Sequence, residues 1–359
     1  MISLQIGLAV AGGLVLAGVV AHGTWSARKN QPKRATPEAA SDKPVTPSVQ
    51  GEPDAHAAAD RHEPSFDADA ALGSLSLLSS LMAIEKKAGL DALIDVITPV
   101  VLESVVSGEA ALAAMPGTRR AGSKPFGVEG LNIATTVWEL PNPGHRYSAF
   151  QCGVQMANRL GALNQIEYSE FVMKTQAFAD AIGGESEFPE MVDEVARARE
   201  LDQFASAHDA QLSFTLRALN TAWSPGYVAQ NAARLGFIAG SIPGRMVLPA
   251  NEQGGAPLLG LAFDTQAAMA EDPEQTALRE VTLSLDVPQV ARVEQPFVRM
   301  RETAAALASS MGGVVMDDNG NPIAPEAMDV IGNELEQLYD TLDERDLSAG
   351  SVLARRLFS

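Results

Sequence analysis

Cysteine and positive charge are what this sequence has least of. Cys152 is the only cysteine, so the chain forms no internal disulfide and has no cysteine cluster to hold a metal. It alternates with Phe150 and Val154, which predicts a small buried side chain. Lys and Arg number 26 against 45 Asp and Glu, and the net charge is −19. Because phosphate contacts need clustered Lys and Arg, this balance excludes nucleic acid as a partner.

Charge of either sign is absent from the start of the chain. Ile2 to Trp25 carries none, and about 20 apolar residues span a hydrocarbon core of roughly 30 Å. Arg28, Lys29, Lys33 and Arg34 follow at once. The positive-inside rule then predicts a single-pass anchor in the inner-membrane lipid bilayer over residues 1–27, with a periplasmic N-terminus and cytoplasmic domains. The alternative, a cleaved secretory signal, would begin with basic residues.

Residues 28–70 have no hydrophobic period and are rich in Pro, Ala, Ser and acidic residues. This composition predicts a disordered linker. His56 and His62 lie within it, and we expect them to be solvated, because a mobile linker seldom fixes the geometry of a metal site. We predict no cofactor and no metal for this chain.

Residues 209–347 carry the clearest secondary-structure pattern. Gln211 to Ala218 alternates between apolar and polar residues and predicts a half-buried strand. Ser224-Pro225 begins a helix that runs to Gly236. Further predicted strands are 237–248, 258–263 and 280–287, followed by a helix from 297 to 311, a hairpin over 314–323 and a helix from 325 to 342. The order β-α-β-β-β-α-β-α predicts an α+β fold with an antiparallel sheet and its helices on one face.

The same order occurs once before, in residues 71–208. Strands are expected at 93–101, 124–131, 136–140 and 147–156, and helices at 107–115, around Phe171 and after Pro189. Gly183-Gly184 corresponds to Gly312-Gly313, but the stretch to the next proline is shorter, so we expect the first copy to lack the terminal hairpin. The sequence therefore predicts tandem modules, with residues 348–359 as a C-terminal tail.

Three segments of the second module carry a family resemblance: Leu235-Gly236-Phe237-Ile238, Leu283 to Pro288, and Gly312 to Asp318, with Pro325 beginning the last helix. Together they resemble the C-terminal FtsZ-binding domain of the ZipA cell-division family. The resemblance implies a membrane-anchored, non-enzymatic adaptor of septum assembly. It also implies that the FtsZ C-terminal tail peptide binds the sheet face left uncovered by helices. The additional module over 71–208 is not part of the usual family plan and indicates a divergent branch with a duplicated domain.

The resemblance also assigns a partner-binding face to the second module. Its residues are those that the strand alternation points away from the helices: Gln211, Ser213, Thr215, Ile242, Ala262, Asp264, Thr282, Ser284 and Asp286. Where the family has large apolar anchors, these residues are small or polar, with Ile242 as the exception. Two hypotheses therefore stay open. The chain tethers FtsZ to the inner membrane, or it is a tethered scaffold of the same ancestry with a different division or envelope partner.

The sequence contains no recognisable catalytic motif, so we predict that the chain is not an enzyme. His145 follows Pro143-Gly144 in a predicted loop and has no acid or nucleophile partner visible in the sequence.

Overall fold

The computed structural model describes residues 89–359, apart from 252–253, 271, 273–274 and 318–319. The predicted anchor and linker lie outside these residues. Within the described part of the chain, no helix is long and apolar enough to cross a membrane. Residues 89–359 belong to the same compact unit. We call residues 89–208 the first module and residues 209–347 the second module.

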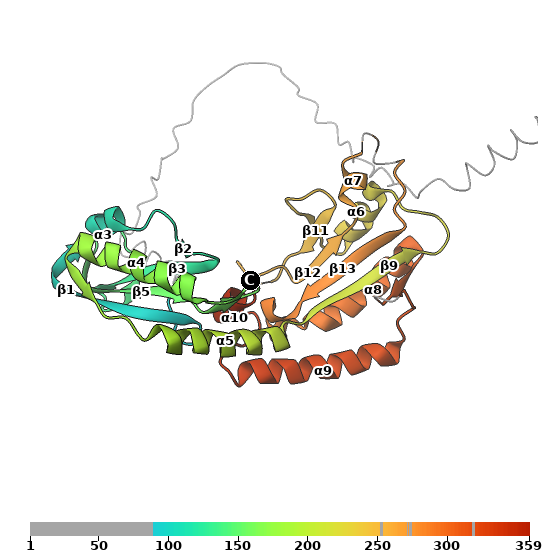
Figure 1. The fold of residues 1–359 in the computed structure, drawn as a ribbon. Helices are drawn as coiled ribbons and strands as arrows, with labels where there is room; N and C mark the ends of the chain where they lie inside the picture. The colour runs from blue at the N-terminus through green and yellow to red at the C-terminus, as the bar shows by residue number, and fades with distance from the viewer. Residues whose placement is uncertain (1–88, 252–253, 271, 273–274, 318–319) are drawn as a thin grey trace, which may run out of the picture. The chain divides into compact units, whose positions relative to one another are not determined.

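The first module is built on a six-stranded antiparallel sheet of order β2-β3-β5-β1-β8, with β4 paired to β3. Helix α4 packs against β1, β2, β5 and β8, and Figure 1 shows it lying along the sheet that contains β3 and β5. The elements are β1 Asp95–Ser107, α3 Gly108–Ala114, β2 Arg120–Ala121, β3 Lys124–Asn132, β4 Trp138–Glu139, β5 Arg146–Gln155, β6 Ala157–Asn158, β7 Gly161–Ala162, α4 Gln165–Ile182, β8 Gly184–Ser186 and α5 Met191–His208.

Local sequence signals fix the position of α4. Asn164 and Glu167 form a reciprocal capping box at its start, and Gly183 ends it in the left-handed conformation at φ 67°. Phe178 of the helix packs edge-on against Phe150 of the sheet, with ring centroids 5.4 Å apart. Cys152 lies in this core, as predicted, and burial raises the pKa of its thiol to about 12.

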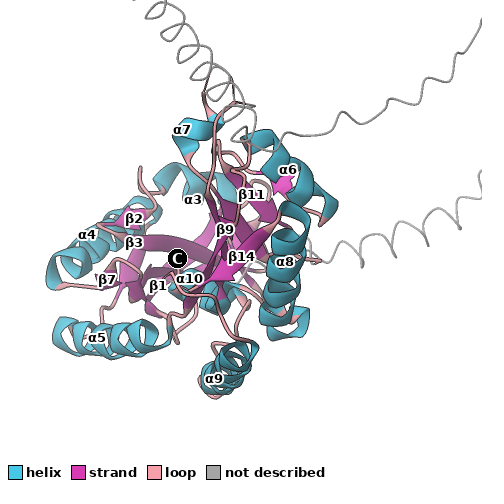
Figure 2. Cartoon of the chain, turned by 90° about the vertical axis from the view of Figure 1, so that its right-hand side faces the viewer, coloured by secondary structure: helices cyan, strands magenta, loops and turns pink. Residues whose placement is uncertain are grey.

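The second module has a sheet of order β10-β11-β12-β13-β9-β14, with α8 along one of its faces (Figures 1 and 2). Its elements are β9 Gln211–Ala218, α6 Pro225–Arg234, β10 Ile238–Ala239, β11 Arg245–Leu248, β12 Leu259–Ala262, α7 Thr265–Ala268, β13 Glu280–Asp286, the short 3-10 helices η1 Val287–Gln289 and η2 Arg292–Glu294, α8 Pro296–Met311, β14 Gly313–Met316 and α9 Pro325–Asp343.

The predicted alternation of β9 is confirmed. Phe214 and Leu216 are buried beneath α8, whose Met300, Leu307 and Met311 are fully buried at helical spacing. Both sheets are antiparallel, so the predicted α+β class is confirmed for the described residues.

The two modules share strand order and register. The order β3-β5-β1-β8 in the first corresponds to β12-β13-β9-β14 in the second. Leu102 pairs with Gly184, and Ala218 pairs with Gly313; each of these glycines follows a left-handed glycine that ends the preceding helix. Pairing at equivalent positions is what a repeated module requires.

The modules differ where the terminal strands end. β14 continues to Met316, which pairs with Thr215, whereas β8 stops at Ser186 opposite Val100. The position equivalent to Thr215 is Pro99, which has no N–H to donate to a ladder. Of the hairpin predicted over 314–323, the first strand is β14, and the second is represented by an isolated bridge between Met316 and Pro322.

The C-terminal tail packs on the body of the protein. It forms α10, Val352–Leu357, and buries Leu357 and Phe358. Gln289 of the second module donates to the Phe358 carbonyl at 2.7 Å, and Gln155 of the first donates to the Arg356 carbonyl at 2.9 Å. The tail is therefore bonded to both modules.

Candidate partner-binding face

The outer face is the side of the second module's sheet opposite α8, and its centre consists of two cross-strand rows. Ala262, Thr282 and Thr215 form one row, and they sit opposite one another on β12, β13 and β9. The second row consists of Gly260, Ser284 and Ser213. The structure thus brings together five of the nine predicted residues: Ser213, Thr215, Ala262, Thr282 and Ser284. Their side chains are small, so this part of the sheet is a shallow floor.

Two predicted residues lie off the sheet. Ile242 is in the turn between β10 and β11, just before Gly244, which has φ 78°. Asp264 caps α7, because its Oδ1 accepts a hydrogen bond from the Gln266 N–H at 2.9 Å. Prediction of one continuous strand over 237–248 was wrong: β10 and β11 are two short strands joined by this turn.

Gln211 and Asp286 lie opposite each other at one end of the outer face, where Arg159 reaches them from the loop between β6 and β7. Arg159 Nη1 donates to Asp286 Oδ2 at 2.8 Å, and its Nε donates to Asp209 Oδ2 at 2.8 Å. These bonds to Asp209 and Asp286 raise the pKa of Arg159 above its ordinary value. Gln211 accepts from Arg159 Nη2 at 3.0 Å when its amide is oriented to satisfy both groups. An intramolecular cation therefore occupies this end.

Two apolar residues at the other edge were missed by sequence reasoning. Val247 pairs with Gly260 and Ile238 pairs with Val247, so both extend the Gly260 row. Ile238 is 55% exposed. The signal for it was present in the sequence, because Ile238 belongs to one of the segments that carry the family resemblance. The outer face thus combines a small-residue floor with an exposed aliphatic edge.

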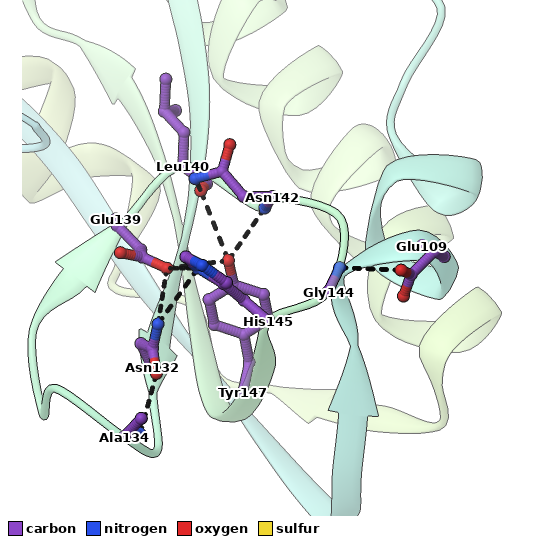
Figure 3. A network of polar contacts seen from close by, with 9 residues as sticks. All are labelled: Glu109, Asn132, Ala134, Glu139, Leu140, Asn142, Gly144, His145 and Tyr147. Atoms are coloured by element: carbon purple, nitrogen blue, oxygen red, sulfur yellow. Dashed lines mark hydrogen bonds and ion pairs between the residues drawn. The ribbon is translucent and has the colours of Figure 1, made fainter. Parts of the chain in front are cut away.

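A separate polar network ties together the corner of β3, β4 and β5 in the first module (Figure 3). Glu139 Oε1 accepts from Asn132 Nδ2 at 2.8 Å and from the Tyr147 hydroxyl at 3.0 Å. His145 Nδ1 lies 2.6 Å from the same oxygen, so the structure supplies an acid partner for His145 that was not visible in the sequence. Burial opposes the charge on Glu139, but the bonds from His145, Asn132 and Tyr147 outweigh it and lower its pKa.

The backbone of Asn142 also joins this network, since its N–H donates to the Tyr147 hydroxyl at 2.9 Å. On the other side of the loop, the Gly144 N–H donates to Glu109 of α3 at 2.8 Å. The network therefore holds the 139–146 connection against both β3 and α3, and we assign it a role in the structure of that corner. In the described residues, no group of His, Cys, Asp and Glu is arranged to hold a metal ion.

Comparison with known proteins bears on the second module. Residues 263–334 match the family model described as ZipA, C-terminal FtsZ-binding domain. The matched range contains β13, α8, β14 and the first half of α9. No protein with a curated description matches the chain. The resemblance predicted from the sequence is thus confirmed for this region, and the family matched is a non-enzymatic one, as expected for the chain.

Proposed function

We propose, from the ZipA C-terminal match over residues 263–334, that this chain is a cell-division adaptor that tethers FtsZ filaments to the inner membrane. The family match is the observation that carries the proposal. The N-terminal apolar segment would supply the membrane anchor, with the modules on the cytoplasmic side.

In this proposal, the FtsZ C-terminal tail binds across the outer face of the second module. The aliphatic edge, with Ile238 exposed and Val247 half-buried, supports this placement, because apolar surface beside a preformed sheet suits an extended or helical peptide. The peptide would lie over the shallow floor formed by Ser213, Thr215, Ala262, Thr282 and Ser284. Gln211 and Asp286 belong to the predicted set, but they could contact the peptide only after their hydrogen bonds to Arg159 are broken.

A second candidate function follows from the polarity of the same floor. Binding energy is usually concentrated in large desolvated side chains, and the two central rows contain none. The alternative is a tethered scaffold of the same ancestry whose second module binds a different division or envelope protein.

The test is fluorescence anisotropy of a labelled FtsZ C-terminal peptide with the full chain and two charge variants. Thr282→Arg places a long cation at the centre of the outer face, and Val298→Arg places the same charge on an exposed position of α8, on the other side of the sheet. We expect micromolar binding that Thr282→Arg weakens about tenfold or more and Val298→Arg leaves unchanged. Absence of saturable binding up to millimolar peptide would reject direct FtsZ recruitment and favour the scaffold.

Membrane attachment is tested separately. We expect the full chain to remain in the membrane fraction after alkaline extraction, and a chain without residues 1–27 to be released. Recovery of both in the soluble fraction would reject the anchor while leaving the peptide-binding test untouched.

A further inference from the structure

The outer face of the first module is covered by a short segment of the chain itself. We call Gly89–Ala92 the strap. It precedes β1 and crosses the sheet face opposite α4, where Gly127, Gly153 and Ile97 form a cross-strand row. This row is equivalent in register to Gly260, Ser284 and Ser213 of the second module, because both rows lie two residues from the paired ends Asp95–Gln155 and Gln211–Asp286.

A glycine pair makes room for one leucine side chain of the strap. A Cβ on Gly153 would lie 2.6 Å from Leu90 Cδ2, and a Cβ on Gly127 would lie 3.2 Å from the same atom. The three atoms nearest to the Gly153 position all belong to Leu90. The absence of side chains at these two positions therefore creates a pocket on the sheet that the leucine occupies.

Side chains of the surrounding elements bind the strap backbone. Glu129 of β3 is 6% exposed, and its Oε1 accepts from the Leu90 N–H at 3.2 Å. Arg356 of α10 donates to the Gly89 carbonyl at 3.0 Å, and Arg197 of α5 donates to the Ala92 carbonyl at 2.8 Å. Asp95 accepts from the Asp91 N–H at 2.8 Å. A backbone held by side chains from four elements, with one side chain in a pocket, is the arrangement of a bound peptide.

Steric fit also fixes the position of Gly89. A Cβ on this residue would lie 1.7 Å from Glu129 Oε1, so only glycine allows the strap to approach the buried carboxylate. Gln151 donates to the other oxygen of Glu129 at 2.8 Å and holds the carboxylate in place.

We propose that the outer face of the first module is a second peptide-binding site, which takes a leucine side chain over Gly127 and Gly153, and that the chain fills this site with its own strap. The ligand class is a short extended peptide with glycine followed by leucine. While the strap is bound, the site is closed to peptides from other molecules, and the outer face of the second module is the one left open. This proposal does not depend on FtsZ binding by the second module.

The experiment displaces the strap and supplies it again as a separate peptide. In the full chain, Gly89→Val with Leu90→Ser removes both the fit to Glu129 and the leucine. The probe is a labelled peptide with the sequence of residues 86–93, KKAGLDAL, and its matched control carries serine in place of the leucine. We expect saturable binding of the probe to the strap variant. Binding of the control peptide should be about tenfold weaker or more, because it lacks the leucine that fills the pocket. Binding of the probe to the wild-type chain should be weaker by at least the same factor, because the tethered strap already occupies the pocket.

Adding Gly153→Val to the strap variant fills the pocket and should abolish binding of the probe. If the folded strap variant fails to bind the probe at millimolar concentration, or binds the serine control equally well, the proposal is overturned. Hydrogen exchange on the single variant Gly153→Val gives a reading that does not require the strap variant to fold. We expect faster exchange at residues 89–92 with β3 and β5 still protected. A uniform loss of protection across the module would show that the strap is an integral part of its core and would overturn the proposal.

Discussion

Replacing Arg356 with Met should destabilise the first module, because it breaks an ion pair to a buried carboxylate. Arg356 Nη2 donates to Asp95 Oδ1 at 2.5 Å, and the Asp95 side chain is fully buried whereas that of Arg356 is 23% exposed. The variant keeps most of the aliphatic stem but leaves the carboxylate without its cation. Breaking a buried pair in this way costs about 3–5 kcal/mol, and the partial exposure of Arg356 reduces our expectation to about 2–4 kcal/mol.

The effect should depend on pH in a defined direction. Burial raises the pKa of Asp95, and the charge of Arg356 offsets part of that rise. Removing Arg356 raises the pKa further. Because a carboxyl with a raised pKa holds its proton more tightly in the folded protein than in the unfolded chain, stability falls as pH rises between the two pKa values. The loss in Arg356→Met should therefore be largest near neutral pH and shrink in mildly acidic solution.

Cys152 provides the assay, because it is the only thiol in the chain and is completely buried in the first module. Its labelling rate with an excess of thiol reagent reports opening of that module. At about pH 7.5 we expect labelling of Arg356→Met to be roughly 30- to 1000-fold faster than that of the wild-type chain, the equivalent of about 2–4 kcal/mol. Arg355→Met is the matched control on the same helix and should label at nearly the wild-type rate.

Asp95→Asn in the Arg356→Met background should recover most of the lost protection, since no buried charge then remains. Two results would refute the reasoning. One is equal labelling rates of the wild-type and Arg356→Met chains, both at about pH 7.5 and in mildly acidic solution. The other is a double variant no more protected than Arg356→Met alone.

Two further predictions concern single residues. Gly183→Ala and Gly312→Ala should each cost about 1 kcal/mol in denaturant unfolding, because both glycines end helices at φ near 67–68°; a loss at only one of them would contradict the equivalence of the two positions. Glu139→Gln should destabilise the chain by about 1–2 kcal/mol at neutral pH. Since the pKa of Glu139 is lowered, its contribution is present above the unfolded pKa and is lost as pH falls through the folded one, so urea titrations of wild type and variant should converge in acid.

Much of the fold was predictable because its signals are local. The alternation of Gln211–Ala218 and the helical spacing of Met300, Leu307 and Met311 depend on neighbours in the chain and on one buried face. The glycines that end α4 and α8 are likewise visible in the sequence. What failed was the turn at Ile242, where Pro243-Gly244 carried a turn signal that the expectation of a continuous strand overrode.

The candidate site was less predictable, because its boundaries are set by contacts between distant residues. Arg159 and Asp286 are 127 positions apart, and Arg356 and Asp95 are 261 apart. A charged residue in a sequence does not show which of many opposite charges it will meet. The contact of Leu90 with Gly127 and Gly153 could not be predicted for a similar reason. Two glycines on separate strands form a pocket only once β3 and β5 are in register.

The strap also determines how the chain would respond to mechanical tension. Load applied from the N-terminal side enters the described structure at Gly89, where it meets the few strap contacts before it reaches β1. These contacts can be broken one after another, and the release of the four strap residues lengthens the chain by at most roughly 14 Å. β1, in contrast, lies between β5 and β8 and is paired with β5 at both of its ends. Its removal requires sliding against neighbours on both sides. The strap would therefore yield at low force and act as a compliant element in series with a stiff sheet.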